Sequence, residues 1–180
     1  MSTVVRLAQS DDAEGISQVI LAALHSSNAR DYPADVIARV ASNFTPDAVL
    51  ELLKHRVVLV AVQDQVIVAT AALDANVVRS VFVNPALQGQ GIGRLLMLEI
   101  ELRARDAGVT TLSVPSSLTA EPFYTKLGFR PRARTALRLA ATEMQRQRAR
   151  RERVDDYFSG PRRTLAPASA PALNSSDLRL

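Results

Sequence analysis

The most informative segment of this 180-residue chain is VFVNPALQGQGIGRLL, residues 81–96. An apolar run of strand character ends at Asn84-Pro85, a glycine-dense loop follows, and an amphipathic helix is predicted from Gly91 to Ala107. Glycines let a ligand approach the main chain closely. The first turn of a helix also presents N–H groups without intrahelical partners, at the positive end of the helix dipole. The segment therefore predicts an anion site suited to a pyrophosphate.

Two common phosphate-binding patterns do not fit this loop. A P-loop ends in Gly-Lys-Ser/Thr, whereas Gly93 is followed by Arg94 and Leu95. A dinucleotide-binding fingerprint that starts at Gly89 or Gly91 needs a third glycine at position 94 or 96, where arginine and leucine stand. The strands expected before the loop have connections short enough for antiparallel neighbours, so no βαβ unit is predicted there.

The sequence around the loop predicts an α/β (α+β) domain. Strands are expected at 4–7, 57–62, 66–72, 77–83 and 110–114, with another beginning at Phe129. Helices are expected after Asp12, at 34–40, after Thr45, at 91–107 and at 119–127.

Composition narrows the class of protein. Apolar residues make up 47% and charged residues 22% of the chain, as in one soluble globular domain. No apolar run reaches the roughly 18 residues of a membrane-spanning helix, and the first residues lack a secretory signal. Cysteine is absent and there are two histidines, so neither a thiolate nucleophile nor a metal site is predicted. We expect a cytoplasmic protein without a membrane partner.

The net charge of +4 is unevenly distributed. Residues 1–130 carry 11 basic and 13 acidic side chains, whereas residues 131–180 carry 11 basic and 5 acidic ones. We predict a domain at 1–145 and a basic, disordered C-terminal tail at 146–180, where Pro, Ser and Ala dominate the final part. The tail lacks interleaved aromatics and a recognition module, so a solvated linker is favoured over a nucleic-acid contact.

A second motif, AEPFYTKLGF at residues 120–129, follows downstream. The first motif, Gln88-x-x-Gly91-x-Gly93 preceded by Val83-Asn84-Pro85, resembles the acetyl-CoA loop of the GNAT superfamily of N-acyltransferases. The second is similar to that family's Ala-x-x-Phe-Tyr-x-x-x-Gly-Phe segment. Together with the order of elements, the resemblance extends from Val4 to about Met144.

The resemblance implies a GNAT-type twisted mixed β-sheet of about six or seven strands flanked by about four helices. The fourth and fifth strands would splay apart around CoA, and backbone groups of Phe82 and Val83 in the fourth strand would pair with the pantetheine arm. The residues expected to bind acetyl-CoA, a co-substrate, are Phe82, Val83, Gln88, Gly89, Gln90, Gly91, Ile92, Gly93 and Arg94.

Tyr124 is the catalytic candidate that the resemblance implies, donating a hydrogen bond or proton to the departing thiolate. Some members of the family carry a glutamate base on the fourth strand, but residues 77–83 contain no carboxylate. Ser80 is a candidate for holding a water molecule, and Asp74 or Asp31 for supplying charge, without a base being assigned. Because cysteine is absent, direct attack in a ternary complex is expected.

The expected function is an N-acetyltransferase that moves an acetyl group from acetyl-CoA to a small-molecule or protein amine. Dimers are common in the family it resembles, so a homodimer is a candidate assembly, and the sequence leaves the assembly state open. The alternative is a non-catalytic acyl-CoA-binding or nucleic-acid-associated module that retains the fold. Ser116 and Ser117 either orient the cofactor or cap the following helix, with capping favoured. The acidic candidates for receiving a cationic amine are Asp31, Asp35, Asp47 and Glu51, although such charges are more often a solvated face.

Overall fold

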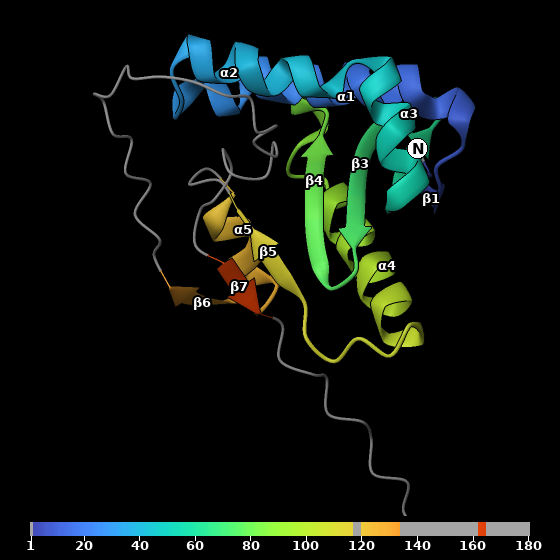
Figure 1. Ribbon diagram of the computed structural model, residues 1–180, viewed down its shortest axis with the longest axis vertical. Coiled ribbons are helices and arrows are strands. Elements are labelled where there is room, and N and C mark those ends of the chain that lie inside the picture. The colour runs from blue at the N-terminus through green and yellow to red at the C-terminus, as the bar shows by residue number, and fades with distance from the viewer. Residues whose placement is uncertain (1, 117–119, 134–161, 165–180) are drawn as a thin grey trace, which may run out of the picture.

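The strands form one mixed, twisted sheet in the computed structural model, which describes residues 2–116, 120–133 and 162–164 (Figure 1). The strand order is β1-β2-β3-β4-β5-β7-β6, and every pairing is antiparallel except the parallel pair β4–β5. The strands are β1 Val4–Leu7, β2 Val57–Gln63, β3 Val66–Asp74, β4 Val77–Val83, β5 Ser113–Pro115, β6 Arg130–Ala133 and β7 Arg162–Thr164. The predicted fold class is confirmed.

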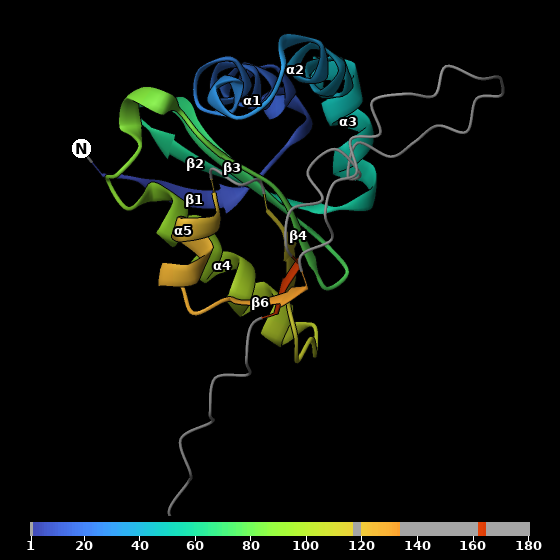
Figure 2. The same cartoon turned by 90° about the vertical axis from the view of Figure 1, so that its left-hand side faces the viewer.

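Helices cover both faces of the sheet, so the molecule has three layers (Figure 2). On one face lie α1 Ala13–Ser26, α2 Ala34–Ala41 and α3 Pro46–His55. On the other lie α4 Ile92–Asp106 and α5 Glu121–Lys126. No helix in the ranges described combines the length and apolarity needed to cross a membrane.

Local sequence explains where these elements begin and end. The Thr45 side chain accepts a hydrogen bond from the Ala48 N–H at 3.3 Å and caps α3, with Pro46 in the first turn. Asp64 and Gln65, which connect β2 to β3, both have positive φ, as a type I′ hairpin turn requires.

The apolar core is divided by the sheet into two clusters. Leu59, Val78 and Ile100 belong to the cluster beneath α4 and α5. Ile20, Val60 and Ala72 belong to the cluster beneath α1, α2 and α3. Strand side chains alternate between these clusters, so both faces of the central strands are buried and their sequences are almost continuously apolar.

Three predictions of element boundaries need correction. The fifth strand begins at Ser113 and not at Thr110, because its one pairing with β4 joins Ser113 to Val77. The helix expected from Thr119 begins at Glu121. β7 lies within 146–180, where no ordered element was expected, and it pairs with both β5 and β6.

The parallel strands β4 and β5 meet only at their beginnings. Val77↔Ser113 is their single register pair, and the strands diverge beyond it (Figure 1). β4 also contains a bulge against β3, where the register steps from Ala72↔Arg79 to Thr70↔Phe82. Ser80 lies in this bulge with φ of 52°. The sheet therefore opens beside the second half of β4.

Candidate functional site

A cavity of about 1140 Å³ occupies the opening between β4 and β5. Its lining includes Val81 and Phe123, which pack on the α4–α5 core cluster, and Phe44 and Phe82, which belong to the α1–α3 cluster. The cavity is therefore lined from both faces of the sheet. Small-molecule sites usually enclose about 300–1,000 Å³, so there is room for a large ligand.

The loop between β4 and α4 is held by its own polar side chains. The Asn84 side chain accepts a hydrogen bond from the Ala86 N–H at 3.0 Å and begins a short 3₁₀ turn, Pro85–Leu87. The Gln88 amide donates to Ser27 Oγ at 2.9 Å and to the Val83 carbonyl at 3.4 Å. These bonds tie the loop to the end of α1 and to the end of β4.

The loop presents a run of backbone donors to the cavity. Gly89 and Gly91 have φ of 82° and 83°, a left-handed conformation that other residues rarely adopt. The first hydrogen bond of α4 runs from the Leu95 N–H to the Gly91 carbonyl at 3.1 Å. Within the described residues, the N–H groups from Gly89 to Arg94 have no backbone acceptor. Such donors at a helix N-terminus form an anion site.

Gly93 is needed for close packing rather than for its backbone angles. A Cβ atom added there would lie 3.2 Å from Cζ of Phe123 and 3.5 Å from a methyl group of Val83. The first turn of α4 therefore packs directly against α5 and β4, which brings the loop beside the aromatic residues of the second motif.

The structure brings the predicted cofactor residues together around the cavity, with one exception. Gln90 is not among the lining residues. The residues that do line it are Phe82, Val83, Gln88, Gly89, Gly91, Ile92, Gly93 and Arg94.

Alternate residues of β4 direct their backbone N–H and carbonyl groups toward β3 or away from it, so Phe82 and Val83 cannot both pair with a ligand in the gap through their backbones. The Asn84 N–H donates to the Val68 carbonyl at 2.8 Å, so Phe82, two residues earlier and opposite Thr70, also directs its backbone groups toward β3. Val83 lies between them and directs its backbone N–H and carbonyl toward the gap. Strand-like pairing with a ligand is therefore available from Val83. The expectation that the Phe82 backbone pairs as well is wrong, because its N–H and carbonyl face β3, and Phe82 contributes its side chain.

Tyr124 both packs in the core and lines the cavity. Its ring contacts Phe123 edge-on, with centroids 5.0 Å apart, and Phe129, with centroids 5.6 Å apart. The residue is only 4% exposed. Burial raises the pKa of its phenol well above the ordinary value of 10.0, so the hydroxyl is held in its neutral, hydrogen-bond-donating form.

Ser116 follows β5 and is 2% exposed. Its hydroxyl has no hydrogen-bond partner in the part of the chain that the structure describes, and the residue lines the cavity. The expectation that Ser116 caps the next helix is wrong, because α5 has Ala120 at its N-cap and no side-chain cap. Ser117 lies outside the described residues. A buried hydroxyl without a partner is costly, so Ser116 is a candidate ligand contact.

The acidic residues considered for an amine acceptor lie elsewhere. Asp31, Asp35, Asp47 and Glu51 are absent from the described lining of the large cavity. Asp47 and Glu51 line a separate hollow of about 570 Å³. Among the candidates for assisting proton removal, Asp74 and Ser80 line the large cavity.

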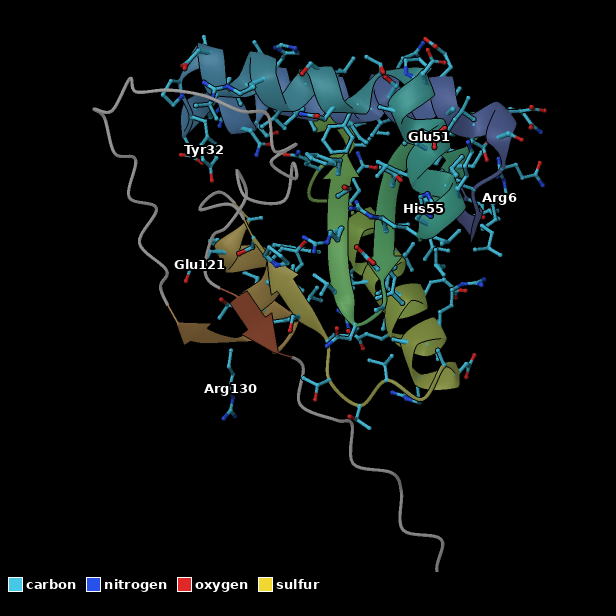
Figure 3. All side chains as sticks on the ribbon, in the orientation of Figure 1. Arg6, Tyr32, Glu51, His55, Glu121 and Arg130 are labelled. Carbon is cyan, nitrogen blue, oxygen red and sulfur yellow. The ribbon has the colours of Figure 1, made fainter. Side chains whose placement is uncertain are left out.

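Two arginines that sequence reasoning missed, Arg56 and Arg79, also line the large cavity. Each stands next to or within an apolar strand, and a charge in an otherwise apolar strand was the available signal. His55, which precedes Arg56 at the end of α3 (Figure 3), is also a lining residue of this cavity. No group of three or more potential metal ligands is found among the described residues.

Comparisons with known proteins place these features in context. The model of a family described as the acetyltransferase (GNAT) domain matches residues 14–140. Among curated proteins, no match is found. Three solved structures show the same fold, each with low sequence identity.

The first is a GCN5-related N-acetyltransferase from Rhodopseudomonas palustris, with a TM-score of 0.74 and 19% identity over 92% of this chain and 96% of that chain. The second is the PaiA N-acetyltransferase from Thermoplasma acidophilum in complex with coenzyme A. It has a TM-score of 0.70 and 17% identity over 93% of this chain and 100% of that chain. The third is a GNAT family acetyltransferase from Brucella melitensis in complex with acetyl-CoA, with a TM-score of 0.54 and 24% identity over 72% and 83%.

Proposed function

This chain belongs to the GNAT acetyltransferase family, and we propose that it is an N-acetyltransferase that moves an acetyl group from acetyl-CoA to a primary amine by direct attack in a ternary complex. One observation carries the proposal: a single cavity brings Tyr124 together with the glycine-loop N–H groups that have no backbone acceptor among the described residues. The solved relatives in complex with coenzyme A and with acetyl-CoA support the choice of co-substrate.

The residues around the cavity fit coenzyme A. The N–H groups from Gly89 to Arg94 would receive the pyrophosphate oxygens, and the positive end of the α4 dipole would stabilise their charge. The Val83 backbone would pair with an amide of the pantetheine arm, as an added strand pairs with a sheet edge. Ser116 would give its unpartnered hydroxyl to the same arm.

When bound, acetyl-CoA supplies the acetyl group as a thioester. Tyr124 would donate a hydrogen bond to the thioester sulfur as negative charge develops there. Full proton transfer from a phenol of pKa ~10 to the thiolate of a thiol of pKa ~8.5 is unfavourable by roughly 2 kcal/mol. Burial raises the pKa of Tyr124 further and increases that cost. Tyr124 therefore acts as a hydrogen-bond donor, and the thiolate takes its proton from water.

Proton removal from the acceptor is the other requirement. An alkylammonium of pKa ~10.4 costs about 4–5 kcal/mol to deprotonate at pH 7. β4 offers no carboxylate for this task. We propose that the proton leaves through water in the cavity, with Ser80 in a position to hold one such molecule.

The decisive experiment follows thiol release from acetyl-CoA across a panel of amines, with the Tyr124→Phe variant beside the wild type. We expect turnover by the wild type and a fall of roughly 10²–10⁴-fold in the variant. The ring still packs between Phe123 and Phe129, so thermal stability should be retained.

Calorimetric titration with CoA separates the outcomes. Binding of CoA without turnover on any amine would support the non-catalytic module instead. Absence of CoA binding would overturn the site itself, and unchanged turnover in Tyr124→Phe would reject the role of the hydroxyl.

A further inference from the structure

A compact charged cluster lines the cavity on the α1–α3 side of the sheet. It consists of Arg56, Asp74 and Arg79. Nε of Arg56 and Nε of Arg79 each lie 3.5 Å from the same Asp74 oxygen, Oδ2. The two arginine side chains are only 15% and 18% exposed.

Strand register brings these three residues to one face. Ala72 belongs to the core cluster beneath α1–α3 and is paired with Val58 on one side and Arg79 on the other. Asp74 lies two residues beyond Ala72, and Arg56 lies two residues before Val58. Because side chains alternate along a strand, Arg56, Asp74 and Arg79 all project toward the α1–α3 side.

The bulge in β4 joins this cluster to the reaction site. Arg79 and Phe82 are three residues apart and would lie on opposite faces of a regular strand. The extra residue at the bulge, where Ser80 has φ of 52°, returns Phe82 to the face of Arg79. Both residues line the cavity that Tyr124 also lines. The charged cluster and the proposed acetyl-transfer site therefore share one space.

Among the described residues, the charged side chains at this end of the cavity are mainly cationic. On the α1–α3 side, the charged residues of the described lining are two arginines and one aspartate. Two of the acidic candidates form ion pairs outside the cavity: Asp35 pairs with Arg39 at 3.5 Å, and Glu51 pairs with Lys54 at 2.6 Å. A cationic group on the acceptor would meet like charge here.

Guanidinium groups have a fixed planar fork of donors that matches the two oxygens of a carboxylate. Their partial burial strengthens attraction to an anion, because the effective dielectric is lower than at the surface. From these contacts and charges, we infer that the acceptor is a primary amine that also carries a carboxylate, held at Arg56 and Arg79 with its amino group directed to the β4–β5 opening. This inference rests on the proposed acetyltransferase function.

The test compares acceptors with and without an anionic group, at a pH above the pKa of every amine so that the nucleophile is deprotonated in each pair. Glycine, β-alanine and γ-aminobutyrate are each compared with their carboxamides, and phosphoethanolamine is compared with ethanolamine. We expect kcat/KM to favour the amino acids over the carboxamides by about 10- to 100-fold, the scale of charge-assisted hydrogen bonds. Preference confined to phosphoethanolamine would overturn the choice of carboxylate.

Variants locate the source of the preference. Arg79→Gln and Arg56→Gln should each reduce it about tenfold, mainly through KM for the amino acid, with carboxamide turnover retained. Arg79→Lys keeps the charge without the fork and should retain part of the preference. Arg39→Gln removes the same charge from the exposed surface of α2 and should change nothing. A preference that survives both glutamine variants would overturn the assignment.

A binding measurement keeps this inference separable from the proposed function. Each amino acid is titrated into the protein saturated with CoA, for the wild type and for Arg79→Gln. Carboxylate binding that the variant weakens supports the inference even if no amine is acetylated, in which case only the catalytic proposal fails. Acetylation of carboxamides as fast as amino acids, or absence of carboxylate binding, overturns the inference and leaves the proposed function standing.

Discussion

At Tyr124, the packing that fixes the ring also determines how the hydroxyl can act. Burial raises the phenol pKa, so ionisation of this group is suppressed across the pH range in which an enzyme is assayed. A neutral phenol beside two aromatic rings is a durable hydrogen-bond donor and a weak acid. In the proposed reaction the side chain would therefore assist the leaving sulfur by orientation more than by acidity.

This environment predicts the pH dependence of the rate. With a proposed acceptor that loses its proton through water, kcat/KM should rise with pH toward the pKa of the amine. Because a hydrogen-bond donor fails only above its own pKa, and burial raises that of Tyr124, no decline should follow below about pH 10. Initial rates between pH 6 and 10 check this. A decline near pH 8–9 that disappears in Tyr124→Phe would contradict it.

Gly93 and Gly89 serve the loop in different ways, and alanine distinguishes them. Gly93→Ala places a methyl group against the Phe123 ring, which should cost about 1–3 kcal/mol of unfolding free energy, partly offset by about 1 kcal/mol of helix propensity. Because Phe123 adjoins Tyr124, kcat should fall as well.

Gly89→Ala is the matched control. Its Cβ would meet open space, but its φ of 82° strains an alanine by about 1–2 kcal/mol. This variant should weaken CoA binding in calorimetry and leave kcat at saturating acetyl-CoA nearly unchanged. Equal losses of kcat in both variants would reject the distinction.

Among the elements, β1 is joined to α1 by an ion pair with its own pH dependence. Arg6 donates two hydrogen bonds to Asp12, at 2.6 and 2.8 Å, and the Gln9 N–H donates a third at 2.7 Å. The Arg6 hydrogen bonds are the main reason that the pKa of Asp12 lies below its ordinary value. This stabilisation is fully present above the unfolded pKa near 3.9.

The stabilisation that Asp12 provides is lost as pH falls through the pKa that this carboxyl has in the folded state, which is lower than its unfolded pKa. The free energy of unfolding should therefore differ between wild type and Asp12→Asn at pH 7, and the two should converge as pH falls below about 4. Urea denaturation at a series of pH values measures this difference. A gap that stays constant to pH 2 would show that protonation of Asp12 is not involved.

Most helices and strands were predicted correctly, because their caps and apolar runs depend on residues that are adjacent in the sequence. Thr45-Pro46 marked the start of α3, and the boundaries of β1 and β4 agree with apolar runs ended by polar or proline residues. β5 was misplaced because its start depends on a parallel contact with Val77, far away in sequence. The bulge at Ser80 also depends on β3, so nothing in the β4 sequence alone indicates that Arg79 and Phe82 share a face.

The candidate site divides in the same way. Glycines and the Phe123-Tyr124 pair form contiguous motifs, and these residues were found from sequence. Asp74 was also named from sequence, but Arg56 and Arg79 were missed, because the three residues come from different positions along the chain and meet only through strand register. Residues in contiguous motifs can be identified from a single sequence, whereas residues that strand pairing brings together cannot.

In the molecule as a whole, β7 (Arg162–Thr164) is part of the sheet although it lies beyond the predicted end of the domain at residue 145. It pairs with β5 through three register pairs and separates β5 from β6 in the sheet. A chain of residues 1–145 lacks β7, so β5 and β6 lose the strand that joins them. We expect its melting temperature to fall by about 2–8 °C, corresponding to roughly 1–2 kcal/mol.

A chain of residues 1–170 retains β7 and is the control, since it also removes part of the basic segment. Its melting temperature should match that of the full chain in the same scan. Identical melting of the 1–145 chain would instead support the predicted boundary at residue 145 and assign β7 no share in stability.

The opening between β4 and β5 also bears on the order of events during turnover. Since its lining belongs to both faces of the sheet, the proposed thioester and amine would reach the reacting atoms from opposite sides, and neither would block the path of the other. We would then expect the two substrates of the proposed enzyme to bind in random order. Free CoA, one of the two products, and a new amine substrate could then bind together in a dead-end complex. Accumulation of CoA would therefore inhibit the enzyme without any dedicated regulatory site.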